Sequence, residues 1–380
     1  MSSPYFTEEH EAFREQIARF VADEVRPHAD AWEEAGEVPR AVLRKMGELG
    51  FLGVRYSADY GGAEMDALGT AVLAEELGRS GLSGFAITVL VHTDMASPHL
   101  DRYGSEEQKA EWMPRIVSGE AICAVGVTEP GAGSDVAGLR TRAEKSGNGW
   151  LLNGAKLYIT NGVLGDVYFI AARTDPEVKA SRGVSMFVVP KETPGFSVAA
   201  KLDKMGWRCS DTAELVFEDC KLPADAILGE ENRGFYQIMD NFQNERIAIG
   251  AMAVGEASRA LEITLEHVKT RQAFGGALWE RQAIRQKLAQ CGARVEAARQ
   301  LVYSAAWKDA QGADCVREVS MVKAFCAEVL QETVYACQQF FGGSGFMRGM
   351  EIERLYRDAR VQAIGGGATE VMYEEVAKRM

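Results

Sequence analysis

The strongest single indication of this protein's fold is the stretch Val127-Thr128-Glu129-Pro130-Gly131-Ala132-Gly133-Ser134-Asp135. A β-branched strand end runs into a Pro-Gly turn, and hydroxyl groups and small residues crowd the turn itself. Gly131 and Gly133 carry no Cβ, so the backbone of such a turn can approach a flat or phosphorylated ligand closely. The stretch therefore predicts a ligand-binding turn.

The bulk composition limits the class of protein. A chain of 380 residues can bury a large core and is long enough for two or three structural regions. Its formal net charge of -13 disfavours a nucleic-acid partner. No apolar run approaches the roughly 18 residues of a membrane span, and the segment 2–15 is acidic and resembles no targeting peptide. We expect a cytoplasmic protein that binds neither nucleic acid nor membranes.

The cysteine and histidine pattern gives no sign of a metal centre. Seven cysteines occur without a CxxC pair, and five histidines occur without an HExxH motif. Free cysteines are commonly small apolar core residues in a reducing compartment. We therefore expect buried, reduced cysteines and no metal site.

The residue pattern of the sequence changes twice along the chain. Residues 6–118 have helical periodicity, whereas 119–226 carry dense Gly and Pro punctuation between short β-branched and aromatic runs. Helical periodicity then returns in four long segments, 234–270, 280–311, 314–340 and 367–379. We expect an α+β fold with an N-terminal helical domain (1–118), a middle antiparallel β-domain (119–226) and a C-terminal four-helix bundle (227–380).

Two nucleotide-binding scaffolds are disfavoured. The glycine-rich segments 131–135 and 342–346 both lack the third glycine of a GxGxxG fingerprint, and the chain has no Gly-Lys-Ser/Thr of a P-loop. A dinucleotide, if one binds, binds on another scaffold.

Glu245 is the residue whose position most suggests acid–base chemistry. It falls on the flank of the apolar stripe of the helix predicted from Gly234, and Arg246 falls near the centre of that stripe. Desolvation would raise the pKa of such a carboxylate and make it a better general base near neutrality. The pattern leaves open an internal ion pair with Arg246, or a solvated edge position.

The segment 365–367 consists of three glycines ahead of a helix. Bare backbone amides and a helix N-terminus suit an oxyanion or a phosphate. A loop followed by a helix cap at Thr369 explains the same residues.

Six motifs in a fixed order give the chain a resemblance to the acyl-CoA dehydrogenase flavoproteins over essentially its full length. The first is the opening stretch. The others are Lys156-Leu157-Tyr158-Ile159-Thr160-Asn161-Gly162, Asn244-Glu245-Arg246, Arg271-Gln272-Ala273-Phe274-Gly275, Gln339-Phe340-Phe341-Gly342-Gly343-Ser344-Gly345 and Arg357-Asp358-Ala359. The resemblance implies bound FAD and a homotetramer, or a dimer of the same tight pairs. It also implies an acyl-CoA substrate that is dehydrogenated at its α,β bond, and electron-transfer flavoprotein as the electron acceptor.

The resemblance also implies a set of binding residues. The flavin would be lined by Val127, Thr128, Ser134, Tyr158, Ile159 and Thr160. The FAD of a neighbouring subunit would be held by Arg271, Phe274, Gln282, Gln339, Phe340, Phe341, Gly342 and Gly343, and further FAD contacts would come from Thr369 and Glu370. The acyl-CoA would be contacted by Ser134, Asn244, Arg246, Gly365 and Gly367.

The base is implied by one substitution in the family pattern. Many members carry a catalytic Glu in the loop before the last helix, and Gly366 stands at that position here. Long-chain and isovaleryl-type members place the Glu on the helix before an Arg, which corresponds to Glu245 here. The resemblance therefore implies Glu245 as the base and the Gly366 amide as a donor to the thioester oxygen.

Two departures bear on the substrate and the cofactor. Gly365 replaces the aromatic residue usual beside this loop, which predicts room for long, branched or terpenoid (citronellyl-like) acyl groups. Ala368 stands where Thr is usual, which predicts one FAD hydrogen bond fewer.

Two other classes share the scaffold. A flavin oxidase or monooxygenase, such as a nitroalkane oxidase, would react with oxygen. A DNA-protecting flavoprotein would need a basic surface, which the acidic composition disfavours.

Overall fold

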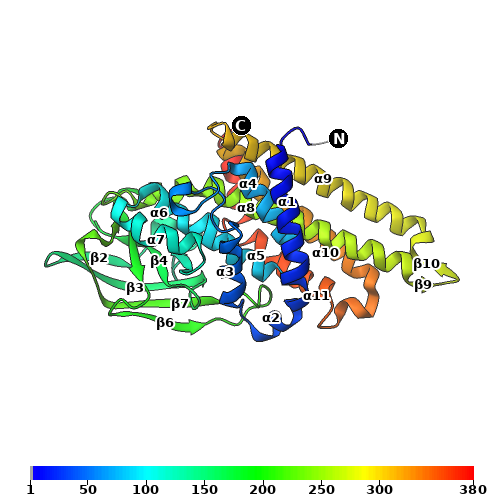
Figure 1. Ribbon diagram of the computed structural model, residues 1–380, viewed down its shortest axis with the longest axis horizontal. Coiled ribbons are helices and arrows are strands. Elements are labelled where there is room, and N and C mark those ends of the chain that lie inside the picture. Colours follow the sequence, from blue (N-terminus) through cyan, green and yellow to red (C-terminus); the bar gives the residue numbers. More distant parts are fainter. Residues whose placement is uncertain (1–2) are drawn as a thin grey trace.

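The computed structural model describes residues 3–380 (Figure 1). A helical segment, an eight-stranded sheet and a second helical segment follow one another along the chain. The sheet forms one end of the molecule, and the long helices of the second helical segment reach to the other end (Figure 1). The predicted α+β class is confirmed.

The first helical segment is built from helices with local capping signals. In the described part of the chain its α-helices are α1 (Glu8–Phe20), α2 (Ala29–Ala35), α3 (Arg40–Glu48), α4 (Ala67–Gly78), α5 (Ser83–Leu90), α6 (Ser97–Tyr103) and α7 (Glu106–Val117). Ser105 caps α7, because its hydroxyl accepts a hydrogen bond from the Gln108 amide at 3.2 Å. Between α5 and α6 the chain forms a π-helical turn, Val91–Ala96.

The sheet has the order β6-β7-β3-β2-β4-β5-β8, with β1 paired to β4 outside this path. Its strands are β1 (Cys123–Gly126), β2 (Arg142–Ser146), β3 (Gly149–Thr160), β4 (Val167–Arg173), β5 (Val184–Pro190), β6 (Phe196–Lys201), β7 (Thr212–Leu222) and β8 (Ile227–Leu228). Most neighbours are antiparallel, as predicted, but β1 and β2 both run parallel to β4. The predicted antiparallel pairing does not hold at these two pairs, because parallel pairing joins strands through long connections that local turn signals do not reveal.

Strand β4 lies in the middle of the sheet and is buried on both faces. Phe169 and Ala171 face one apolar core with α6 and α7, while Tyr168 and Ile170 face a second core. The Tyr168 ring lies 4.7 Å from the ring of Phe196 on β6, although three strands separate β4 from β6 in the sheet. The sheet is therefore curved around the second core.

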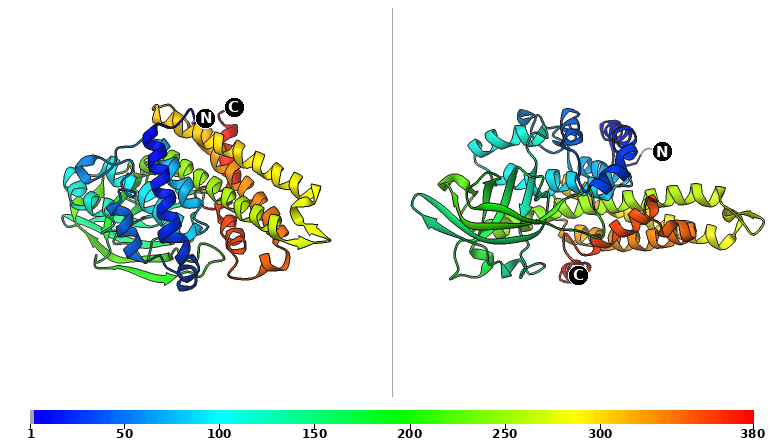
Figure 2. Two further views of the ribbon diagram at one scale, coloured as in Figure 1. Left: turned by 45° about the vertical axis from the view of Figure 1, so that its right-hand side comes forward. Right: turned by 90° about the horizontal axis from the view of Figure 1, so that it is seen from below.

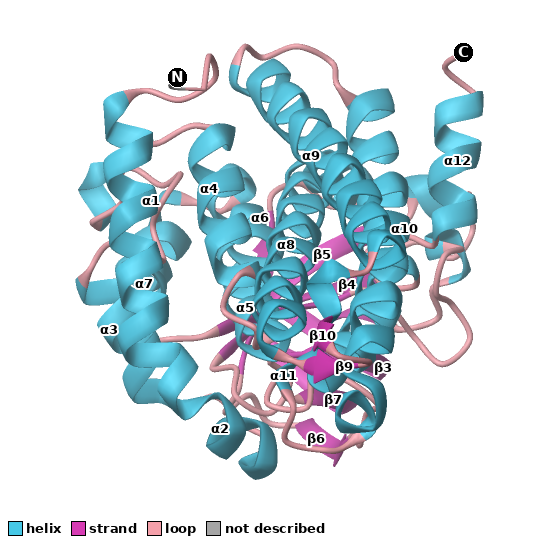
Figure 3. Ribbon diagram, turned by 90° about the vertical axis from the view of Figure 1, so that its right-hand side faces the viewer, coloured by secondary structure: helices cyan, strands magenta, loops and turns pink. Residues whose placement is uncertain are grey.

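The second helical segment contains three long helices and two short ones. They are α8 (Gly234–Thr270), α9 (Gln282–Ala310), α10 (Val316–Phe341), α11 (Glu351–Ala359) and α12 (Thr369–Ala377), and a hairpin of β9 (Gln272–Ala273) and β10 (Gly276–Ala277) joins α8 to α9. Figure 3 shows α8, α9 and α10 side by side. The four predicted helices are present, while α11 and the small hairpin were not predicted because both are short.

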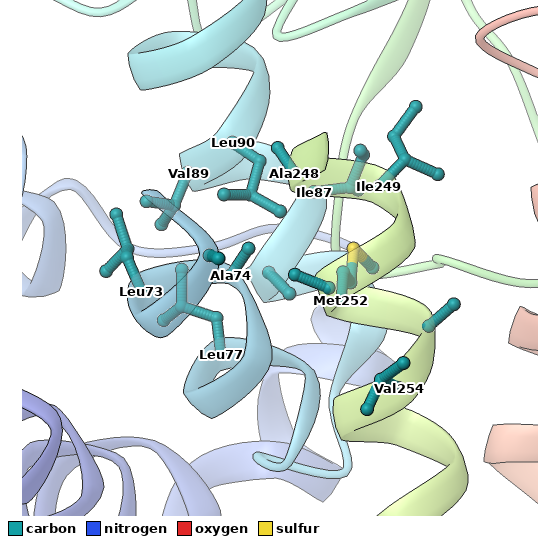
Figure 4. Packing of buried hydrophobic residues seen from close by; sticks show 14 of the residues in the cluster. Leu73, Ala74, Leu77, Ile87, Val89, Leu90, Ala248, Ile249, Met252 and Val254 are labelled. Atoms are coloured by element: carbon teal, nitrogen blue, oxygen red, sulfur yellow. The ribbon is translucent and has the colours of Figure 1, made fainter. Parts of the chain in front are cut away.

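The two helical segments share one apolar core, although they are far apart in the sequence. Helix α8 lies between the N-terminal helices and α10 (Figure 2, right). Side chains from α4, α5 and α8 interdigitate there (Figure 4). A Cβ at Gly78 of α4 would collide with the Met252 carbonyl, and one at Gly255 of α8 with the Glu75 carbonyl, so glycine permits this close crossing.

The cysteines lie inside this fold. All seven are buried and free. The prediction of reduced core cysteines agrees with these positions.

Candidate active site

The turn at 127–135 is fastened to strand β3 by a buried ion pair. Lys156 of β3 is fully buried, and its Nζ lies 2.7 Å from Oε1 of Glu129. The same ammonium donates to the Val127 carbonyl at 3.2 Å, and the Leu157 amide donates to the Thr128 carbonyl at 2.9 Å. The turn is thus held against β3 by both side-chain and backbone contacts.

The Glu129 carboxylate is fully used by the fold. It accepts hydrogen bonds from the amides of Arg140 and Thr141, at 2.7 and 3.0 Å, besides that from Lys156. Burial works to raise the pKa of Glu129, but the charge of Lys156 and these hydrogen bonds lower it below its usual value. Burial lowers the pKa of Lys156 to about 8, against the opposing charge of Glu129.

The glycines of the turn leave its outer side open. No atom of the described chain would lie within 4 Å of a Cβ at Gly131 or Gly133. Ser134 is exposed on the same turn. The turn therefore presents backbone and a hydroxyl to solvent, as the sequence predicts for a ligand-binding turn.

Tyr158 lies beside this turn in an uncommon backbone conformation. Its φ is +61° and its side chain is 66% exposed, at a register irregularity between Lys156 and Ile159 where β3 pairs with β7. An exposed aromatic ring on strained backbone is typical of a functional position. Thr160 is half-buried, whereas the Ile159 side chain points into the core, so Ile159 has only backbone to offer a ligand.

Glu245 of α8 and the glycine loop before α12 meet in space. A methyl group at Gly366 would lie 3.1 Å from Oε1 of Glu245 and 2.5 Å from Cδ1 of Ile249. Gly366 has a φ of +65°, a conformation that favours glycine. The structure therefore brings together two features that lie far apart in the sequence, the helix carboxylate and the loop amide.

The Glu245 carboxyl has no salt-bridge partner within 4 Å among the described residues. Burial raises its pKa, and the charges of Arg246 and Lys323 offset part of that rise. The alternative of an internal Glu245–Arg246 ion pair is not formed. A partly exposed carboxyl with a raised pKa is suited to accept a proton near neutrality.

Arg246 is buried, as its place on the apolar stripe predicts. Its Nη1 donates to Oγ of Ser320 at 3.1 Å, and its guanidinium lies 5.2 Å from the centre of the Phe242 ring. Its Nε is buried and has no partner among the described residues. The hydrogen-bonding capacity of the Arg246 guanidinium is therefore only partly used by the described residues.

Asn244 is occupied within the protein. Its amide donates to the backbone and side chain of Asp94, at 3.0 and 3.2 Å, and its oxygen accepts from Arg55 at 2.6 Å. Asp94 belongs to the π-helical turn between α5 and α6, and such turns are frequent at functional sites. Asn244 therefore anchors α8 at this turn rather than presenting a free amide.

The remaining predicted substrate residues lie in the loop before α12. Gly365 is exposed, and a Cβ there would lie 3.8 Å from Val361. Gly367 has a φ of +100°, and its carbonyl accepts a hydrogen bond from Lys323. Thr369 begins α12, and its hydroxyl donates to the Ala363 carbonyl at 3.4 Å, while Glu370 is exposed.

The predicted residues for a neighbouring FAD gather at the opposite end of the molecule. Phe274 is 93% exposed at the tip of the β9–β10 hairpin, and Gln339, Gly342 and Gly343 are exposed where α10 ends. The Phe341 ring stacks on His267 at 4.2 Å, which joins the ends of α8 and α10. The hairpin is far from the sheet (Figure 1), so one chain does not bring these residues to Tyr158. The set also includes Arg271, Gln282 and Phe340, at the same end.

Two buried lysines lie at this site, and the sequence motifs predict a role for neither. Lys156 stands within the motif 156–162, and Lys323 lies outside all six motifs. The signal for Lys323 was available, because it is one charged residue inside the apolar run 321–327 of a predicted helix.

Other kinds of site find no support in the described residues. They contain no cluster of three or more His, Cys, Asp or Glu side chains that could hold a metal ion. Among the helices that the structure describes, none is long and apolar enough to cross a membrane.

Three family models match the chain one after another. They are described as the N-terminal, middle and C-terminal domains of acyl-CoA dehydrogenase, and they match residues 7–120, 124–220 and 232–380. The helix–sheet–helix order and the open turn beside Tyr158 agree with these three parts.

Individual relatives extend over nearly the whole chain. The mitochondrial long-chain specific acyl-CoA dehydrogenase of Mus musculus is 40% identical over 376 residues, which cover 99% of this chain and 87% of the mouse protein. The mitochondrial isovaleryl-CoA dehydrogenase of Pongo abelii is 37% identical over 369 residues, with 96% and 87% covered. A solved glutaryl-CoA dehydrogenase of Mycobacterium smegmatis in complex with FADH2 has a TM-score of 0.93 and 31% identity, with 99% and 95% covered.

These matches define the class of protein as a flavoprotein oxidoreductase. Within that class, the chain belongs to the acyl-CoA dehydrogenase family, as its motifs predict.

Proposed function

We propose that this protein is an FAD-dependent dehydrogenase that converts an acyl-CoA thioester to its trans-2-enoyl-CoA, with Glu245 as the base. The observation that carries the proposal is the contact between the Glu245 carboxyl and the Gly366 position, 3.1 Å from Oε1 to a methyl group there. The base and the carbonyl donor of this reaction must act on neighbouring atoms of the substrate.

Glu245 removes the pro-α proton from the thioester. Its raised pKa keeps the carboxylate basic enough to take a weakly acidic proton. The free amide of Gly366 donates to the thioester oxygen, which stabilises the negative charge that develops as the proton leaves. The Gly367 amide lies next in the loop and is a second contact for the substrate.

The open turn and Tyr158 fit an FAD isoalloxazine ring. The Leu157 amide joins the turn to β3 next to Tyr158, and the hydroxyls of Thr128, Ser134 and Thr160 have no hydrogen bond among the described residues. These donors suit the polar edge of a flat ring. Bound FAD supplies the acceptor for the β-hydride.

We propose that a second subunit completes the FAD site. The β9–β10 hairpin, which carries Phe274, lies at the end of the molecule opposite the sheet, which carries Tyr158 (Figure 1). The exposure of Phe274, Gln339, Gly342 and Gly343 at the far end of α8 and α10 supports a homotetramer in which they contact the FAD of a neighbour. Electron-transfer flavoprotein is the proposed electron acceptor, and the cytoplasm stays the predicted location.

The substrate class follows from the space beside the loop. Gly365 leaves the position of a side chain unfilled, with its nearest neighbour Val361 at 3.8 Å. The Nε of Arg246 is buried without a partner among the described residues, and Arg246 is a proposed contact of the acyl-CoA. We propose long or branched acyl chains, terpenoid chains such as citronellyl included, as substrates.

The test is anaerobic flavin reduction by a panel of short, long, branched and terpenoid acyl-CoAs. Long or branched thioesters are expected to bleach the flavin, and air is expected to reoxidise it slowly while electron-transfer flavoprotein does so rapidly. Fast hydrogen peroxide formation would instead show a flavin oxidase, such as a nitroalkane oxidase. In Glu245→Gln, reduction is expected to fall at least about a hundredfold, and near-normal reduction would refute Glu245 as the base.

A further inference from the structure

Lys323 of α10 is a fully buried lysine beside the proposed base. Its side chain has no exposed surface, and it stands in the apolar run Met321–Ala327. Removing an ammonium from water costs several kcal/mol, and lysine is almost never fully buried unless it is paired. Burial of the Lys323 ammonium at this desolvation cost indicates that its charge interacts with another group nearby.

The direct partner of Lys323 is a backbone group of the glycine loop. Its Nζ donates to the carbonyl of Gly367, and the described residues contain no salt bridge to it within 4 Å. Gly366 and Gly367 both have left-handed backbones, with φ of +65° and +100°, so the loop has few conformational restraints of its own. The bond from α10 therefore fixes the loop that carries the Gly366 amide.

The charged groups around Lys323 come from two of the helices that pack against α10. They are Glu245 and Arg246 on α8, and Glu370 on α12. One turn earlier on α10, Ser320 accepts the hydrogen bond of Arg246 at 3.1 Å. Helix α10 thus holds both neighbours of the Glu245 carboxyl, Arg246 through Ser320 and the loop through Lys323.

We propose that Lys323 is a positioning residue for the proposed base: it fixes the 365–367 loop through the Gly367 carbonyl and places its positive charge near the Glu245 carboxylate. The inference rests on the proposed function, because it assigns Lys323 to the same proton transfer. Lys323 itself touches neither substrate nor cofactor in this assignment.

The positive charge of Lys323 affects the pKa of Glu245 in a known direction. Burial raises the pKa of Glu245, and Lys323 is one of two cations that lower it. Removing the ammonium therefore raises that pKa further, and the pH above which Glu245 is an ionised base moves upward. Burial lowers the pKa of Lys323 itself to about 8, partly offset by Glu245, so its charge is present at neutral pH.

The test compares three substitutions that separate the charge from the hydrogen bond. Lys323→Met removes both, Lys323→Gln keeps a donor for Gly367 without the charge, and Lys323→Arg keeps both. The flavin-loaded protein is mixed anaerobically with a substrate acyl-CoA, and the first-order rate of flavin reduction is measured from pH 5 to 9.

The expected results differ between the variants. Lys323→Met lowers the plateau rate about tenfold and moves the acid limb of the profile up by about one pH unit, the scale of one nearby charge. Lys323→Gln moves the limb by the same amount with a smaller loss in plateau rate. Lys323→Arg restores the native limb. An infrared titration of the Glu245 carboxyl, identified by its loss in Glu245→Gln, is expected to show the same upward shift without substrate.

The matched control is Lys204→Met. Lys204 is another lysine whose ammonium bonds to a backbone carbonyl, that of Ser210 at 2.5 Å, and burial lowers its pKa to about 8. It does not act on Glu245. Its substitution is expected to lower the melting temperature without moving the acid limb or the infrared titration.

The outcomes separate this inference from the proposed function. If Lys323→Met and Lys323→Gln lower the melting temperature and leave both the acid limb and the infrared titration unchanged, Lys323 is only structural and the inference is overturned. If Glu245→Gln reduces the flavin normally, the proposed base is wrong, whatever the Lys323 variants do.

Discussion

Two regions of this molecule contain the same pair of residue types and use them in opposite ways. At the turn, Lys156 and Glu129 form a closed ion pair at 2.7 Å. At the loop, Lys323 bonds to the Gly367 carbonyl and leaves the Glu245 carboxyl without a direct ion pair among the described residues. Both lysines are fully buried, and both have a pKa lowered to about 8 by burial.

The two glutamates differ in the direction of their pKa. Glu129 accepts two backbone amides as well as the ammonium, which lower its pKa despite burial. Glu245 lacks such donors, so burial prevails and its pKa is raised. A lysine buried beside a glutamate is therefore structural where the carboxylate is fully hydrogen-bonded, as Glu129 is. Where the lysine is bound to another group, as Lys323 is, the neighbouring carboxyl stays able to accept a proton.

The largest expected effect is the loss of stability when the buried Lys156–Glu129 ion pair is broken. Lys156→Met leaves the Glu129 carboxylate buried without its cation, and removal of one partner from such a pair costs about 3–5 kcal/mol. Chemical denaturation of the purified protein measures this loss. The control is Lys145→Met on the neighbouring strand β2, whose pair with Glu231 is exposed and is worth about 1 kcal/mol or less. Equal losses in the two variants would contradict a structural role for the buried pair.

The second prediction applies one substitution to both regions. Glu245→Gln is expected to keep FAD and acyl-CoA binding and to lose at least about a hundredfold in flavin reduction, because the base is missing. Glu129→Gln is expected to weaken FAD retention and stability instead, since it loosens the turn. Stopped-flow reduction and flavin content measure the two effects. A hundredfold loss of reduction rate in fully flavin-loaded Glu129→Gln would remove the distinction.

A smaller effect tests the opposite pKa directions. Glu245 has a higher pKa folded than unfolded, so its contribution to stability is present below the unfolded value of about 4.5 and is lost as the pH rises through the folded value. Glu245→Gln should therefore melt higher than the native protein at pH 8 and not at pH 4. Glu129 has a lowered pKa, so its contribution is present above about 4.5 and is lost as the pH falls.

Melting curves at pH 8 and pH 4 decide this prediction. Glu129→Gln should melt lower than the native protein at pH 8, with a smaller difference at pH 4. A Glu245→Gln variant that melts below the native protein at pH 8 would show that this carboxylate stabilises the fold.

The smallest expected effect concerns the unfilled space beside Gly365. Gly365→Phe meets no backbone strain and only Val361 at 3.8 Å, so the fold should tolerate it. The new ring should shift the preference among acyl-CoAs toward short chains by about tenfold. Gly366→Ala is the matched control, because its left-handed φ and its contact with Ile249 should lower activity toward all chains alike. An unchanged preference in Gly365→Phe would show that this side of the loop does not face the acyl chain.

Much of the fold was predictable because its signals are local. The predicted segment 234–270 coincides with α8. The parallel pairing of β1 with β4 was not predictable, because no local residue pattern distinguishes it. The hydrophobic period also gave no boundary for α11, whose nine residues are too few for a clear pattern.

The candidate site, like the fold, was predictable only in part. The sequence alone identified Glu245, the glycine loop and the motifs of the family, because residue type and order along the chain carry that information. Only the tertiary structure decided that Glu245 lies beside Gly366, that Asn244 is occupied by Asp94 and Arg55, and that Lys323 is buried near them. These facts depend on how α8, α10 and the last loop pack together, and packing between distant segments sets the desolvation that tunes a carboxyl group.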